Sequence, residues 1–112
     1  ICHGSPSNIN EYLYPDSSLN KIKKALDRFN YVACGHSHYQ FIIRTASNKF
    51  LFNPGSIGQP RDRGKKGACW ASFNLKTKKV RFFDTEYNRD RVIQTSKNID
   101  KEVPYLYEVL TR

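Results

Sequence analysis

The residues best suited to chemistry are the three histidines of this 112-residue chain. His36 and His38 lie in the run Gly35-His36-Ser37-His38, and His3 lies close to the first residue. A neutral imidazole nitrogen is a common ligand for transition metals. On an extended chain that leaves a strand, residues at i and i+2 point to the same side, so His36 and His38 are expected to face one target. Each histidine follows a short apolar run, and this placement suggests a metal site.

The spacing of these histidines predicts how they meet. His3 and His36 are separated by one predicted helix, which is the spacing of a strand-helix-strand crossover. Such a crossover places the carboxyl ends of two parallel strands side by side, where ligands gather in open α/β sheets. We therefore expect the three rings to converge, with Gly35 providing a sharp turn. The spacing alone leaves a second interpretation open, in which the histidines are surface residues or form ordinary hydrogen bonds.

A second candidate segment, residues 53–56, follows another predicted strand. Backbone N–H groups and a hydroxyl at a strand end can bind an anion, and Arg61 and Arg63 nearby suit phosphate oxygens. The candidate phosphate-binding residues are therefore Asn53, Gly55, Ser56 and Arg61. A plain turn that ends the strand is the alternative. A site for two hard cations also needs carboxylates, and the sequence beside the histidines offers none.

Charge and composition limit the classes of partner. The net charge is +9, and residues 49–81 hold nine Lys or Arg against one acidic residue, Asp62. This excess favours anionic partners such as phosphate esters or nucleotides, and a solvated basic face is the alternative. Basic residues also interleave with aromatic ones, as in nucleic-acid-binding modules. Strand alternation would bury half of these aromatic side chains, so we do not expect nucleic acid as a partner.

The chain is expected to be a cytoplasmic piece of a longer protein. It contains no methionine, and no apolar run approaches the roughly 20 residues of a membrane helix, so no membrane association is expected. The cysteines lie in apolar runs without C-x-x-C spacing, which predicts small buried side chains in a reducing compartment. A zinc site that uses Cys2 or Cys34 remains open but lacks the usual ligand spacing. The sequence does not predict the oligomeric state.

Hydrophobic periodicity predicts the elements that must position these residues. A helix is expected from the capping residues 16–18 to Asn30, with Leu19, Ile22, Leu26 and Phe29 in the core. Strands are predicted at 1–2, 31–34, 41–43, 50–52, 69–75 and 80–85, with turns at 47–48 and 76–79. Helical patterns follow beyond residue 88 and at 103–110. This order predicts an α/β fold with a mixed sheet in layers.

Three segments together resemble the calcineurin-like metallophosphoesterase superfamily, and most of all its small bacterial and archaeal phosphodiesterases. They are His3-Gly4, Gly35-His36-Ser37-His38, and the run Asn53-Pro54-Gly55-Ser56-Ile57-Gly58-Gln59-Pro60-Arg61-Asp62. The resemblance implies a two-layer β-sandwich flanked by helices, with two divalent metal ions (Mn, Fe, Ni or Zn) at the strand ends. It implies that His3 and His36 bind one ion and His38 the other. The implied substrate is a phosphate ester, with nucleotides among the candidates.

The chain lacks the motifs that form the first half of the family pattern. The Asp-x-His, Gly-Asp and Gly-Asn-His motifs, which supply the bridging aspartate and further ligands, do not occur before the His-Gly motif. We therefore expect residues 1–112 to be the carboxyl-terminal part of one metallophosphoesterase domain. The parent protein is expected to hydrolyse phosphodiesters or phosphomonoesters, and this piece alone is expected to be inactive. A non-catalytic metal-binding or protein-interaction scaffold with the same fold is the alternative.

Overall fold

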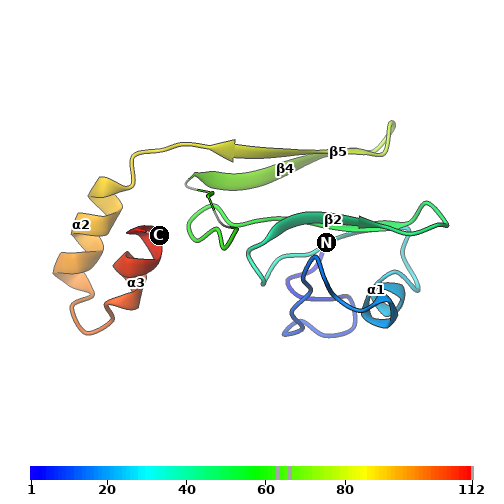
Figure 1. The fold of residues 1–112 in the computed structure, drawn as a ribbon, viewed down its shortest axis with the longest axis horizontal. Coiled ribbons are helices and arrows are strands. Elements are labelled where there is room, and N and C mark those ends of the chain that lie inside the picture. Colours follow the sequence, from blue (N-terminus) through cyan, green and yellow to red (C-terminus); the bar gives the residue numbers. More distant parts are fainter. Residues whose placement is uncertain (63, 66, 112) are drawn as a thin grey trace.

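The computed structural model describes residues 1–62, 64, 65 and 67–111. Among these residues, one helix precedes all the strands, and the remaining helices follow the last strand (Figure 1). In order, the elements are α1 (Leu19–Ala25), β1 (Tyr31–Ala33), β2 (Gln40–Arg44), β3 (Phe50–Pro54), β4 (Ala68–Asn74), β5 (Lys79–Thr85), α2 (Asp90–Ile99), α3 (Tyr105–Glu108) and the 3-10 helix η1 (Val109–Thr111). No helix in this described part of the chain is both long and apolar enough to cross a membrane.

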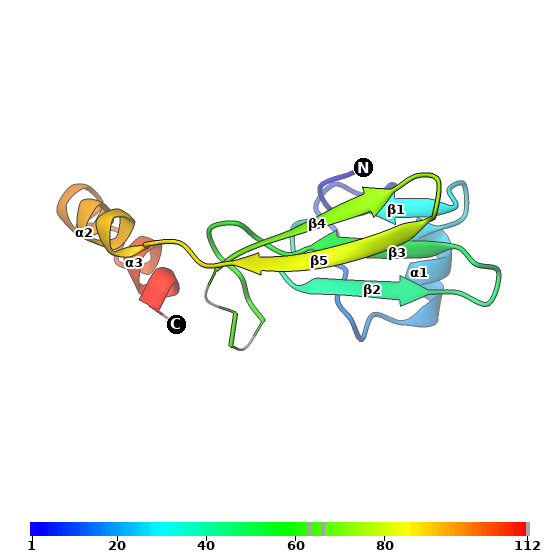
Figure 2. The ribbon, with the colours of Figure 1, turned by 90° about the horizontal axis from the view of Figure 1, so that it is seen from above.

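The strands form two sheets that lie one above the other. The first has the order β1-β3-β2, with β1 parallel and β2 antiparallel to the central strand β3. The second is the antiparallel hairpin β4–β5, which lies over one face of the first sheet, while α1 lies on the other face (Figure 1). Helices α2 and α3 lie beyond one end of the sheets (Figure 2). The predicted mixed α/β sandwich is confirmed.

One core lies between α1 and the three-stranded sheet. It contains Leu13, Ile22, Ala25, Leu26, Val32, Cys34, Phe41 and Leu51, all of them buried. Two predicted core positions of the helix were wrong, because Leu19 and Phe29 are exposed. Helix α1 also ends at Ala25 rather than at Asn30. The Lys49 ammonium group donates to the carbonyl oxygens of Leu26 and Asp27, which satisfies backbone groups just beyond this earlier end.

A second, aromatic core joins the two sheets. The ring of Phe73, on β4, lies 5.5, 5.6 and 5.9 Å from the ring centroids of Tyr31, Phe50 and Phe52. Phe73 therefore packs against residues of both parallel strands, and it seats the hairpin on the sheet. Strand β3 is buried along nearly its whole length because it has neighbours on both faces.

The predicted turns are confirmed, and the first predicted strand is not. Asn48 and Lys78 adopt positive φ angles of 58° and 56° within the two hairpin turns. Residues 1–2 form no strand, although the chain there runs beside β1. The amide of Cys2 donates to the Ala33 carbonyl at 3.0 Å, and the amide of Gly35 donates to the His3 carbonyl at 2.7 Å. These two bonds bring His3 to the carboxyl end of β1.

Candidate metal and phosphate site

His3 and His36 meet at the end of β1, as their spacing predicts. Atom Nε2 of His3 lies 2.8 Å from Nδ1 of His36, and the two ring centroids are 4.5 Å apart. Two nitrogen ligands of one tetrahedral metal ion, each about 2.1 Å from it, are separated by about 3.4 Å. The observed distance is that of a hydrogen bond between the two rings, and it is shorter than the separation in such a site.

The backbone of the histidine loop adopts an uncommon conformation. His36 and His38 have φ angles of 63° and 62°, in the left-handed region, so the expected extended chain is wrong at both residues. Gly35 is not the source of the turn, because the positive-φ glycines in the described ranges are Gly55 and Gly64. A left-handed non-glycine residue costs about 1–2 kcal/mol. Such residues cluster at functional sites, where the surrounding structure holds them in place.

Asn53 holds this loop in its conformation. Its side-chain amide donates to the Gly35 carbonyl at 2.8 Å and to the Ser37 hydroxyl at 3.0 Å, and its oxygen accepts the Gly55 amide at 2.9 Å. Both Asn53 and Ser37 are completely buried. Asn53 was expected to bind a phosphate group. In the structure its side-chain nitrogen and oxygen atoms bind groups of the protein instead. Asn53 ties the end of β3 to the loop after β1.

His38 faces a different partner from the other two histidines. Its Nδ1 lies 3.1 Å from the Gln59 carbonyl oxygen, so Nδ1 carries the proton and Nε2 is left to accept or to ligate. The Arg61 amide donates to the His38 carbonyl at 3.2 Å. Burial lowers the pKa of His38, as do the charges of Arg61, His36 and His3, and the Gln59 carbonyl opposes them. A lowered pKa favours the neutral imidazole, the form that binds metals.

The remaining phosphate candidates differ in what they offer. Gly55 shapes the turn, because its φ is +88° and a Cβ there would lie 2.6 Å from the Cβ of Cys69. The Ser56 hydroxyl accepts the Gln59 amide at 3.0 Å, which closes the next turn. Arg61 is exposed beside His38 and is the candidate best placed to meet an anion. The other predicted arginine, Arg63, lies outside the described residues.

The metal donors are incomplete in the part of the chain that the structure describes. Within it, no group of three or more His, Cys, Asp or Glu side chains lies close enough to hold a metal ion. The three rings therefore converge only in part: His3 and His36 form a pair, and His38 lies on the adjacent loop. The donor set, three imidazole nitrogens without carboxylates, suits borderline metals but fills neither of two coordination spheres.

The cysteines do not complete the site. Cys34 and Cys69 are buried free thiols, and Cys2 is a half-buried one. Burial raises the pKa of Cys34 to about 12 and also raises the pKa of Cys2 and of Cys69. The predicted burial of Cys34 and Cys69 is confirmed. The Cys2 thiol donates to the carbonyl oxygens of Gly4 and Ala33, and the Cys34 thiol donates to that of Phe52, so both thiols are engaged by the backbone.

Sequence reasoning missed one neighbour of the histidines, Tyr12, and one contact of a nearby loop, made by Asp62. The ring of Tyr12 stacks on His36 with centroids 3.9 Å apart and an angle of 28°. The signal for Tyr12 was its place next to Leu13, whose burial turns its neighbours outward. Asp62, the single acid of the basic segment, accepts the Gln40 amide at 2.8 Å and so ties its loop to β2. No sequence signal marked that contact.

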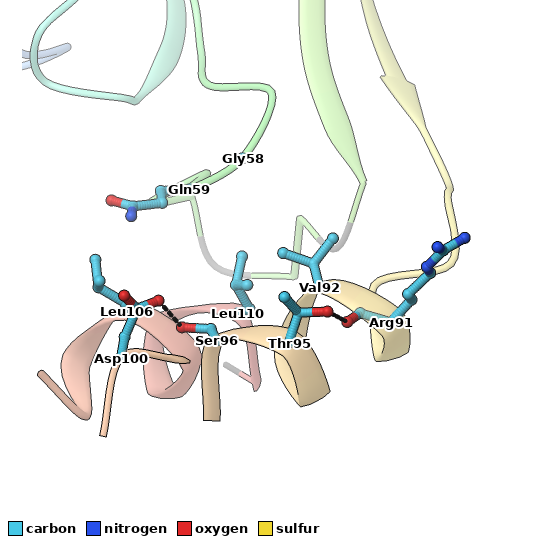
Figure 3. Close-up of a pocket in the computed structure, with 9 residues that line it drawn as sticks. All are labelled: Gly58, Gln59, Arg91, Val92, Thr95, Ser96, Asp100, Leu106 and Leu110. Carbon is cyan, nitrogen blue, oxygen red and sulfur yellow. Dashed lines mark hydrogen bonds between the residues drawn. The ribbon is translucent and has the colours of Figure 1, made fainter. Parts of the chain in front are cut away.

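A pocket of about 530 Å³ borders the loop that holds His38 (Figure 3). It is lined by Gly58, Gln59, Arg91, Val92, Thr95, Ser96, Asp100, Leu106 and Leu110. The side chains of Val92 and Leu110 rise from the helices toward the loop, which gives the pocket an apolar floor (Figure 3). The carbonyl of Gln59, one of the lining residues, is the group that orients His38.

Comparison with known proteins gives this geometry its context. Residues 1–78 match the model of the calcineurin-like phosphoesterase superfamily domain. An uncharacterized protein of Methanocaldococcus jannaschii, MJ0912, is 34% identical over 105 residues, which cover 77% of this chain and 40% of that protein. The hypothetical protein PH1004 of Pyrococcus horikoshii has a similar crystal structure, with a TM-score of 0.77, 25% identity, and coverage of 97% of this chain and 44% of that one.

A metallophosphoesterase of Sphaerobacter thermophilus shares the fold. Its TM-score is 0.76 at 24% identity, with coverage of 98% of this chain and 53% of that one. The chain thus spans about half, or less, of the length of each of these three relatives.

Proposed function

The chain belongs to the calcineurin-like phosphoesterase superfamily, and on that basis we propose that it forms part of a dinuclear, metal-dependent hydrolase of phosphate esters. The observation that carries this proposal is the 2.8 Å approach of His3 Nε2 to His36 Nδ1. A small increase in this separation, to about 3.4 Å, lets both imidazole nitrogens bind one metal ion. His38, with its Nδ1 engaged by Gln59, offers Nε2 to the second.

Each residue of the site has a distinct role in this proposal. His3 and His36 would hold one divalent ion and His38 the other, with Mn, Fe, Ni or Zn as the candidates. When bound, these ions would supply an activated water and neutralise charge on the phosphoryl oxygens. Asn53, through Ser37 and Gly35, fixes the loop that carries two of these ligands.

The residues after β3 shape the substrate side of the site. Gly55 and Ser56 form the turns that place Gln59 beside His38. Arg61, exposed next to His38, is the cation that meets the phosphate group by paired hydrogen bonds. The substrate is a phosphodiester or phosphomonoester, and nucleotides are among the candidates.

In this proposal the carboxylate ligands come from the rest of the full-length protein, and residues 1–112 are the carboxyl-terminal part of one domain. The finding that supports it is that the described residues hold no group of three or more His, Cys, Asp or Glu side chains able to bind a metal ion. Assayed alone with manganese and a generic phosphodiester, the 112-residue chain is expected to show no substantial turnover. Turnover equal to that of the full-length protein would contradict this division of the site.

The test of the function is hydrolysis by the full-length protein. With manganese present, it should cleave bis(p-nitrophenyl) phosphate, and a chelator should abolish this activity. The change His36→Ala should lower kcat/KM by at least about a hundredfold, because it removes one ligand of the metal. Asn10→Ala, at an exposed residue of the neighbouring loop, is the control and should leave the rate unchanged. Absence of hydrolysis in a protein that binds metal would favour the non-catalytic scaffold.

A further inference from the structure

A row of aromatic rings leads away from the histidine pair. Tyr12 stacks on His36 at 3.9 Å, and Tyr14 stacks on Tyr12 with centroids 5.9 Å apart and an angle of only 7°. Tyr39 meets Tyr14 edge to face at 5.7 Å. The row therefore starts at a proposed metal ligand and ends at the residue that directly follows His38.

Local structure fixes this row before any ligand arrives. Leu13 is buried in the core, so its neighbours Tyr12 and Tyr14 project together from the other side of the chain. The Tyr14 amide donates to the Ser17 hydroxyl at 2.8 Å, and the Ser17 amide donates to the Tyr14 carbonyl at 3.0 Å. Tyr39 packs against the core cluster. The rings are thus held by the fold, and binding against them costs little ordering entropy.

A pocket of about 430 Å³ lies at the far end of the row, lined by Tyr14, Pro15, Asp16 and Tyr39. Its volume is within the range of small-molecule sites, and its walls are two aromatic rings, a proline and one carboxylate. An aromatic wall binds a planar ring by stacking. The carboxylate of Asp16 repels phosphate and accepts hydrogen bonds, so it suits a ring that carries an N–H or O–H donor.

We propose that this tyrosine pocket, defined by Tyr14, Pro15, Asp16 and Tyr39, binds a planar, donor-bearing ring on the alcohol part of the phosphate ester. The inference rests on the proposed function, because it places the phosphate at the histidines and Arg61. The charges at the two ends set one orientation: the anion lies at the cationic end and the ring lies beside Asp16. A nucleoside supplies both a stacking ring and donors, whereas a simple aryl group supplies the ring alone.

Equilibrium binding tests this assignment without turnover. Isothermal titration calorimetry on the metal-free, full-length protein compares adenosine monophosphate, phenyl phosphate and glycerol phosphate. Phenyl phosphate is expected to bind about tenfold more tightly than glycerol phosphate, because stacking on an aromatic side chain contributes at this scale. Adenosine monophosphate adds a hydrogen bond to Asp16 and is expected to bind about tenfold more tightly than phenyl phosphate. Equal affinity for all three ligands would overturn the proposal.

Variants separate stacking from hydrogen bonding. Tyr14→Ala should remove the gain in affinity that stacking gives each of the two ring ligands. Tyr14→Phe, which keeps the ring, should retain this gain. Asp16→Ala should weaken only adenosine monophosphate, about tenfold, and an unchanged affinity there would overturn the donor part of the assignment. Tyr87→Ala, at a tyrosine that is 39% exposed and follows β5, is the matched control.

Two checks complete the design. Loss of binding in Tyr14→Phe equal to that in Tyr14→Ala would contradict stacking, and thermal melting of each variant verifies that it folds.

The proposed ring-binding pocket and the proposed function can be contradicted independently of each other. Ring-selective binding by a full-length protein that cleaves no ester would refute the function alone, whereas hydrolysis without ring selectivity would refute the pocket alone.

Discussion

At the scale of single residues, the histidine loop is held by a buried polar network rather than by a flexible glycine. Two left-handed histidines flank Ser37, which is buried and accepts the amide of Asn53. The strain of this conformation is offset by the three hydrogen bonds of Asn53. The geometry of the proposed metal ligands His36 and His38 is therefore coupled to the side chain of Asn53.

Removal of the Asn53 amide should release the loop. Asn53→Ala leaves the Gly35 carbonyl, the Ser37 hydroxyl and the Gly55 amide without their partner in a buried place, so the free energy of unfolding should fall by about 3 kcal/mol. Chemical denaturation measures this change. Asn10→Ala, at an exposed position, should stay within about 0.5 kcal/mol of the wild type. A loss below about 1 kcal/mol in Asn53→Ala would show that the network does not hold the loop.

Gly55 and Gly64, two glycines with positive φ that follow β3, allow backbone strain to be compared with a steric clash. Gly55→Ala combines a φ of +88° with a contact of 2.6 Å to the Cys69 side chain, whereas Gly64→Ala has a φ of +82° and open space around it. Gly64→Ala should cost about 1 kcal/mol of unfolding free energy through strain alone. Gly55→Ala should cost about 3 kcal/mol, since overpacking is added. Thermal or urea unfolding measures both, and equal losses would contradict the predicted clash.

At the scale of elements, the hairpin β4–β5 is seated on the sheet by few large contacts. Phe73 is the β4 side chain that meets the rings of both β1 and β3. The two hairpins themselves are local structures, with turns that the sequence marks clearly. The junction between the sheets is therefore more sensitive to single substitutions than either hairpin.

Truncation of Phe73, which joins the two sheets, should lower the free energy of unfolding. Phe73→Ala should reduce the free energy of unfolding by about 2–3 kcal/mol, because it removes ring contacts with Tyr31, Phe50 and Phe52 in a partly buried place. Phe29→Ala is the matched control, since that ring is 49% exposed, and it should change little. Equal effects of the two substitutions in urea unfolding would contradict the role given to Phe73.

Local patterns predicted most helices and strands, whereas long-range contacts decided the rest of the fold. Short apolar runs, alternation and turn residues were sufficient to predict strands β2 to β5, since a hairpin is a short-range structure. Apolar spacing alone extended α1 too far, because it cannot detect that Lys49 binds the carbonyls of Leu26 and Asp27. The spacing of His3 and His36 predicted their meeting.

The finer geometry of the site was beyond sequence reasoning. Left-handed φ angles at His36 and His38 depend on partners far along the chain, chiefly Asn53. The same holds for the stack of Tyr12 on His36. In both cases only the fold shows which neighbour the residue meets.

At the scale of the whole molecule, the chain spans 40%, 44% and 53% of the length of the three relatives. Its basic segment and exposed Arg61 are positively charged. Within the described residues, no group of three or more His, Cys, Asp or Glu side chains could hold a metal ion. The proposed activity is therefore assigned to the full-length protein, with the three histidines and their loop as this chain's proposed share of the site.

Metal content per molecule tests this account most directly. The full-length protein, equilibrated with manganese and analysed by mass spectrometry of the metal, should hold two ions. His36→Ala and His38→Ala should each lose about one ion, because the account assigns these ligands to different metals. Asn10→Ala should still hold two ions. Unchanged metal content in both histidine variants, with their fold intact, would contradict the claim that these histidines form one side of a two-metal site.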